Sequence, residues 1–186
     1  MSTVKINATP DNPYIIPGTD IKILKDWHWG TEEDQGPHFY AFTGEADYTK
    51  YPGVSAKVIL PTKLCVKSSK NGDKYAYISL GVCGHAGWGD GFDMGIANHG
   101  DGWYPVWNDV IPKITIHETD FTATPEMNPY SALITVEPLN TSQVRLVVQF
   151  ANRSGNVIKI NGQSVFSKTY TAKTPKQWQV YYHFAS

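Results

Sequence analysis

The residues with the chemistry for a binding site gather in one stretch, WGDGFDMGIANHGDGWYPVWND, at residues 88–109. It holds three of the six tryptophans, together with four aspartates and five glycines. Flat indole rings can cover the C–H face of a pyranose, while carboxylates and amides bind its hydroxyl groups. The stretch therefore predicts a saccharide site built from Trp88, Asp90, Asp93, Asn98, His99, Asp101, Trp103, Trp107 and Asn108.

The same stretch has the pattern of a β-hairpin. Apolar residues recur with a period of two before and after residues 99–102, whose His-Gly-Asp-Gly sequence is typical of a turn. Aromatic residues on strands often fill protein cores. A packed hairpin without a ligand is therefore the alternative interpretation.

Acidic residues offer few pairs for glycoside hydrolysis, which requires two carboxyl groups across one bond. Asp90 and Asp93 are three positions apart, so on a strand they face opposite ways. Glu45 and Asp47 share a face in the segment GEADY and form the best remaining pair. A solvated strand face is the alternative for that pair.

Calcium is the metal that the residue types favour most. Asp90, Asp93, Asn98 and Asp101 supply oxygen ligands in one tract, with the three aspartates as the main candidates. The spacing of an EF-hand loop is absent, and acidic turns without metal are common. Zinc spacing and nucleotide-binding motifs are also absent, so we expect no cofactor, with calcium as the exception to test.

The composition predicts one folded domain over residues 1–186. Hydrophobic residues make up 41% of the chain and charged residues 18%, with a formal net charge of −1. This charge and the lack of basic runs argue against a nucleic-acid partner. No apolar stretch reaches the roughly 20 residues that cross a bilayer, and no signal peptide is visible. We expect a soluble chain, extracellular if a leader has been removed.

Short runs of Val, Ile, Tyr, Phe and Thr, bounded by Gly, Pro, Asn and Asp, predict an all-β fold with little or no helix. About a dozen such strands fit an antiparallel β-sandwich of two sheets. The predicted strands cover residues 4–9, 20–25, 38–48, 55–67, 74–83, 91–98, 102–109, 113–119, 132–138, 143–152, 156–162 and 177–184.

The two cysteines fall in strands that we expect to form a hairpin around Asn71 and Gly72. Matching the apolar faces pairs Leu60 with Val82, Leu64 with Ile78, and Val66 with Ala76. Cys65 and Cys83 would then lie about 20 Å apart along the strands, beyond the reach of a disulfide. The sequence therefore predicts two free thiols.

The strand-turn-strand unit GFDMGIANHGDGWYPVWND, set among many short strands over residues 38–150, resembles the central sheet of concanavalin A-like jelly rolls. That group includes legume-type lectins, glucanases and polysaccharide lyases. The resemblance implies a concave sheet with a groove for a glycan, without implying catalysis. The alternating E-x-D-x-E run of the glucanases is absent. The lyases use Arg, Gln, His and Tyr, and the matching residue types here are His117, Arg145, Gln149, Tyr181 and His183.

Three functions follow as hypotheses. The first is a non-catalytic, lectin-like carbohydrate-binding domain whose partner is a glycan or polysaccharide. The second is a glycan hydrolase or polysaccharide lyase on the same fold, with Glu45 and Asp47, or His117 and Tyr181, as acid and base. The third is a toxin-like or interaction β-sandwich whose aromatic residues contact a membrane surface or another protein.

Overall fold

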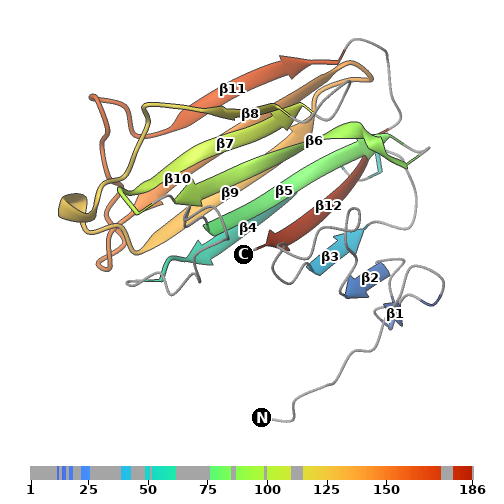
Figure 1. The fold of residues 1–186 in the computed structure, drawn as a ribbon, viewed down its shortest axis with the longest axis horizontal. Coiled ribbons are helices and arrows are strands. Elements are labelled where there is room, and N and C mark those ends of the chain that lie inside the picture. The colour runs from blue at the N-terminus through green and yellow to red at the C-terminus, as the bar shows by residue number, and fades with distance from the viewer. Residues whose placement is uncertain are drawn as a thin grey trace, which may run out of the picture.

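The computed structural model describes residues 12, 14–15, 17–18, 22–25, 39–42, 49–50, 52–61, 76–84, 87–98, 100–109, 115–172 and 178–185. These residues form two antiparallel sheets and contain no α-helix (Figure 1). The predicted all-β class is thus confirmed. In this part of the chain no helix has the length and hydropathy to span a membrane.

The larger sheet has eight strands, and all its neighbouring pairs are antiparallel. The N-terminal strands lie at one edge, and the C-terminal strand is inserted between the third and fifth strands of the chain. In spatial order the strands are β1 (Tyr14–Ile15), β2 (Lys22–Lys25), β3 (Phe39–Phe42), β12 (Trp178–Ala185), β5 (Ala76–Gly84), β6 (Gly87–Asn98), β7 (Trp103–Asp109) and β8 (Thr115–Glu118).

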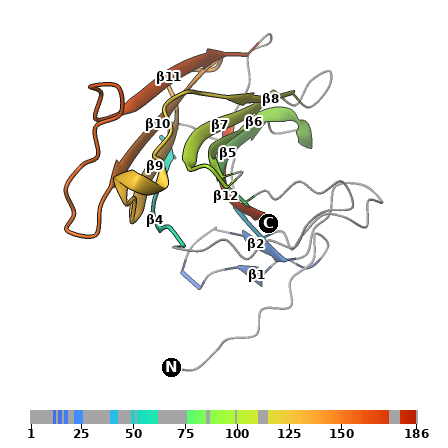
Figure 2. The same cartoon turned by 60° about the vertical axis from the view of Figure 1, so that its left-hand side comes forward.

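The smaller sheet has four strands and lies against the larger one as a second layer (Figure 2). Its strands in spatial order are β11 (Phe166–Thr171), β10 (Gln143–Ala151), β9 (Ser131–Pro138) and β4 (Val54–Ile59). A short 3-10 helix, η1 (Pro125–Met127), precedes β9. Strands β11 and β4 are the two edges of this sheet.

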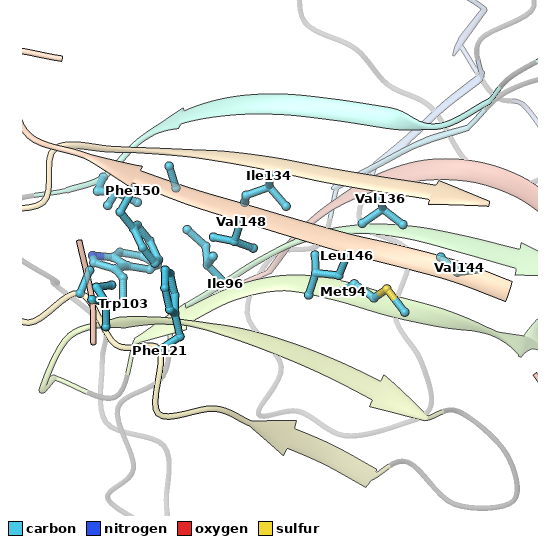
Figure 3. Close-up of a cluster of buried hydrophobic side chains, with 14 of the residues drawn as sticks. Met94, Ile96, Trp103, Phe121, Ile134, Val136, Val144, Leu146, Val148 and Phe150 are labelled. Carbon is cyan, nitrogen blue, oxygen red and sulfur yellow. The ribbon is translucent and has the colours of Figure 1, made fainter. Parts of the chain in front are cut away.

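The two sheets share a buried hydrophobic cluster (Figure 3). Strands β9 and β10 bury every second residue, because side chains alternate between the faces of a strand. Burying one large aliphatic side chain contributes about 1.5–3 kcal/mol, so this alternation supplies much of the driving force for folding. The labelled members are Met94, Ile96, Trp103, Phe121, Ile134, Val136, Val144, Leu146, Val148 and Phe150.

The predicted hairpin between residues 55–67 and 74–83 is wrong. Strand β4 pairs with β9 in the small sheet, while β5 lies between β6 and β12 in the large one. Val82 pairs with Val180 on one side and with Phe92 on the other, so β5 has no free edge there with which Leu60 could pair. Period-two alternation assigns residues to a face but does not select the neighbouring strand.

The cysteine prediction loses its basis with this register. The backbone of Cys83 lies in β5 opposite Gln179, while Cys65 lies outside the described residues, as do Asn71 and Gly72. That both thiols are free stays a prediction.

Two strand assignments after β10 also differ from the structure. Residues 156–162 form turns with isolated bridges, because Asn161 and Gly162 adopt φ values of 51° and 79° that close a two-residue turn. The last strand of the small sheet is instead β11, with the sequence FSKTYT. The polar residues at alternate positions of this segment concealed its β-character.

Candidate functional site

The predicted hairpin of residues 91–109 is present as β6 and β7. Ile96 is paired with Pro105 and Asn98 with Trp103, and the turn between them is stabilised by a side chain. The Asn98 Oδ1 atom accepts a hydrogen bond of 2.6 Å from the Gly100 backbone N–H. This turn thus depends on the residue types that marked it in the sequence.

Trp103 lies in the core rather than on the surface. Only 3% of its surface is exposed, and its backbone forms two hydrogen bonds with Ala123, of 3.1 and 2.8 Å. Figure 3 shows the side chain at one end of the core beside Phe121 and Phe150. The ring of Trp103 therefore acts in packing.

Two polar residues of the predicted saccharide site, Asn98 and Asp101, lie at the β6–β7 turn. Asn98 is 7% exposed and occupied by the turn, whereas Asp101 is exposed at its tip. Asp93 pairs with Asn108 across the hairpin, and the next cross-strand pair is Met94 with Trp107. Of the remaining predicted residues, Trp88 and Asp90 are described in their β6 backbone only, and His99 lies outside the described residues.

Both faces of the hairpin are buried near its turn. Ala97, Tyr104 and Val106 form a second buried cluster with exposures of 0%, 4% and 0%. These residues alternate with Ile96 and Pro105, which belong to the opposite face. Residues 94–98 and 103–106, which flank the turn, are therefore buried and do not present an aromatic surface to a ligand.

His117 and Tyr181, one of the two predicted acid–base pairs, lie on strands that are far apart in the large sheet. His117 is opposite Trp107 in β8, and Tyr181 lies in β12. Strands β5, β6 and β7 separate β8 from β12, which corresponds to about 19 Å at a strand spacing of about 4.8 Å. Glu45 and Asp47 lie outside the described residues.

The lyase-type residues belong to different sheets. Arg145 and Gln149 lie in β10 of the small sheet, whereas His183 lies in β12 of the large sheet. Arg145 forms an ion pair with Glu137 on the neighbouring strand. The guanidinium group of Arg145 is therefore engaged by a carboxylate of the small sheet.

No group of three or more His, Cys, Asp or Glu side chains suited to a metal ion is found within the described ranges. Of the three aspartates predicted as calcium ligands, Asp101 is the one whose side chain is described, and it is exposed in the turn. The side chains of Asp90 and Asp93 are not described.

A different group of residues joins the two sheets at their β7 and β11 strands. The ring centroid of Trp107 lies 5.0 Å from that of Tyr170 and 6.3 Å from that of Phe166. The Lys168 ammonium nitrogen lies 5.7 Å from the centroid of the Trp107 ring and 6.0 Å from that of Tyr170. We call Trp107, Phe166, Lys168 and Tyr170 the edge cluster.

Alternation along β11 explains the edge cluster. Phe166, Lys168 and Tyr170 occupy every second position, so they share the face of the strand that is turned to the core. The three aromatic side chains are partly buried, whereas Lys168 is exposed. Of these four, only Trp107 belongs to the predicted saccharide site, although the period-two run of FSKTY was a usable signal for the other three.

Buried aromatic rings support the edge cluster from within. The Phe121 ring lies 5.9 Å from that of Phe166 and 6.2 Å from that of Phe150, between centroids. Phe121 is 4% exposed and Phe150 fully buried. The row of rings therefore runs from the core to the partly exposed Trp107 and Tyr170.

No protein-family model matches the chain, and no curated protein matches it. The function therefore has to be inferred from the geometry of the edge cluster.

Proposed function

We propose that this chain is a non-catalytic, lectin-like carbohydrate-binding domain whose site includes the edge cluster. The observation that carries the proposal is the contact between two partly buried rings from different sheets, Trp107 and Tyr170, beside the exposed Lys168. Rings that keep part of their surface exposed can stack on the C–H face of a sugar, and a nearby polar group can orient its hydroxyls.

The Trp107 and Tyr170 rings are held in place by packing, which favours a ligand-binding site over two apolar side chains that are merely exposed. Trp107 and Tyr170 lie on strands and pack against the buried core, and the Trp107 ring also contacts that of Phe166. Packing of this kind restricts their rotamers. A site ordered before the ligand arrives avoids part of the entropy cost of binding.

The proposal includes the architecture. Two antiparallel sheets with a shared core support a β-sandwich of about a dozen strands, similar to the concanavalin A-like jelly rolls. Those domains provide the glycan-binding framework that the proposed function requires.

A binder is favoured over a hydrolase or lyase. General acid and base groups must both reach the reacting bond. His117 and Tyr181 lie on strands separated by three others, so this pair lacks the required proximity. The edge cluster itself holds a lysine and three aromatic residues and no carboxylate.

The test is a screen against a panel of glycans and polysaccharides, followed by titrations monitored by tryptophan fluorescence. We expect saturable binding that weakens about tenfold in Tyr170→Ala, the size of effect that loss of one ring contact supports. The matched control is Tyr130→Ala, which removes another partly buried tyrosine that contacts Arg153 outside the cluster. Circular dichroism verifies folding of both variants.

Three results would contradict the proposal: no saccharide in the panel binds, the folded Tyr170→Ala variant binds as tightly as the wild type, or the sugar is recovered cleaved. Recovery of an intact sugar together with selective loss in Tyr170→Ala supports a non-catalytic binder.

A further inference from the structure

Lys168 differs from the other members of the edge cluster in charge and exposure. Its ammonium group lies over two aromatic rings, at 5.7 Å from the Trp107 centroid and 6.0 Å from the Tyr170 centroid. Cation–π attraction of this kind holds the ammonium near the rings without using its three hydrogen-bond donors. The charge is therefore held beside the two rings on which a sugar would stack.

The ammonium group has no counter-ion in the described part of the chain. No carboxylate there forms an ion pair with Lys168, and no side-chain hydrogen bond involves it. Arg145 on the adjacent strand β10 shows the opposite arrangement, since its charge is balanced by Glu137. Lys168 thus retains its capacity to bind an anion.

The net charge of the protein gives it no preference for an anionic ligand. The formal net charge is −1, so an anionic ligand gains no general attraction from the protein. Selectivity for an anion must therefore come from a local cation, and Lys168 is positioned to provide it.

We propose that the edge cluster selects an acidic saccharide, one that carries a carboxylate, with Trp107 and Tyr170 stacking on the sugar ring and Lys168 binding its carboxylate. This inference rests on the proposed carbohydrate-binding function and specifies its ligand class. It assigns Lys168 the role of a specificity-determining residue.

A lysine on an edge strand also has a structural use. An inward-pointing charge on an edge such as β11 prevents pairing with the edge of another sheet. A lysine with this role alone would leave saccharide preference unchanged when its charge is removed. The two roles therefore differ in a measurable property.

The experiment compares oligogalacturonides with their methyl esters, which have the same sugar chain without the charge. Affinities are measured by isothermal titration calorimetry for the wild type, Lys168→Gln and Lys168→Arg. Lys57→Gln is the control, because Lys57 is also exposed and also lies on an edge strand, β4. Size-exclusion chromatography verifies that each variant stays folded and in the same assembly state as the wild type.

We expect the wild type to bind the acidic oligomer about fivefold more tightly than the ester, the ratio that an exposed charge pair supports. This preference should vanish in Lys168→Gln, persist in Lys168→Arg and Lys57→Gln, and decline as salt increases.

Equal affinity for acid and ester, or a preference that survives in Lys168→Gln, would overturn the acidic-ligand inference and leave carbohydrate binding intact. Binding of only neutral members of the glycan panel would have the same meaning. Absence of binding to every saccharide would overturn both proposals.

Discussion

Trp103 and Trp107 show how two identical residues, four positions apart on one strand, differ in burial. Both lie on the face of β7 that is turned to the core. Trp103 is near the turn and 3% exposed, whereas Trp107 contacts the edge strand β11 and stays partly exposed. A tryptophan at the limit of a core can serve both packing and recognition, while one inside it serves packing alone.

Replacing Trp103 with alanine should therefore affect stability. We expect Trp103→Ala to lower the free energy of unfolding by about 3–5 kcal/mol, the usual cost of truncating a buried aromatic side chain. Urea denaturation measures this change, and the milder Trp103→Phe serves if the alanine variant does not fold. Lys57→Ala, on the exposed face of β4, should stay within about 0.5 kcal/mol of the wild type. A loss below about 1 kcal/mol in Trp103→Ala would show that the ring is not part of the core.

At the scale of elements, the β6–β7 turn depends on two glycines with different constraints. Gly100 has φ of 109° and open space around its missing Cβ, whereas Gly102 has φ of 145° and no such space. A Cβ atom on Gly102 would lie 2.8 Å from the Ala123 carbonyl oxygen and 2.8 Å from the Thr122 Cγ2 atom. Backbone strain acts at both positions, and a steric clash is added at Gly102.

We expect Gly100→Ala to destabilise the protein by about 1 kcal/mol, because alanine disfavours positive φ. Gly102→Ala should cost at least about 1 kcal/mol more, since the segment around Ala123 must also move. Thermal and urea unfolding of the two variants test this order. Equal destabilisation would contradict the close approach of the turn to residues 122–124.

Local patterns allowed the hairpin to be predicted, but sheet neighbours depend on packing of the whole chain. Alternation before and after a Gly-rich turn was enough for β6 and β7, because both partners are adjacent in sequence. Strand β4 pairs with β9, about 75 residues further along, and nothing in its own residues encodes that choice. Strand β11 was missed because Ser167, Thr169 and Thr171 resemble a polar loop, although Phe166 and Tyr170 face the core side. The alternation of Phe166, Lys168 and Tyr170 was a signal for the strand itself, but the contact of this strand with Trp107 follows from the long-range arrangement and could not be predicted from local sequence.

At the scale of the molecule, the two sheets are joined by more than their shared core. Trp178, at the start of β12 in the large sheet, is 1% exposed and donates a hydrogen bond of 2.8 Å to the Asn140 carbonyl oxygen. Asn140 lies between β9 and β10 of the small sheet. Strands that are far apart in the chain are therefore stabilised together, which favours cooperative unfolding.

Trp178→Phe removes this hydrogen bond and should lower the free energy of unfolding by about 1–3 kcal/mol. Leu139→Ala, an exposed position beside Asn140, is the control and should change it by less than about 0.5 kcal/mol. We expect unfolding curves from fluorescence and circular dichroism to coincide in both variants. Separate transitions would show that the sheets unfold independently.

The most direct test of the proposed site is a nuclear magnetic resonance titration with a saccharide that binds in the panel. The chain has six tryptophans, and their indole N–H signals can be assigned with single Trp→Phe variants. We expect the Trp107 signal to shift saturably while the signals of the buried Trp103 and Trp178 stay in place. A Trp107 signal that does not move at saturating ligand, while another tryptophan responds, would contradict a site at the edge cluster.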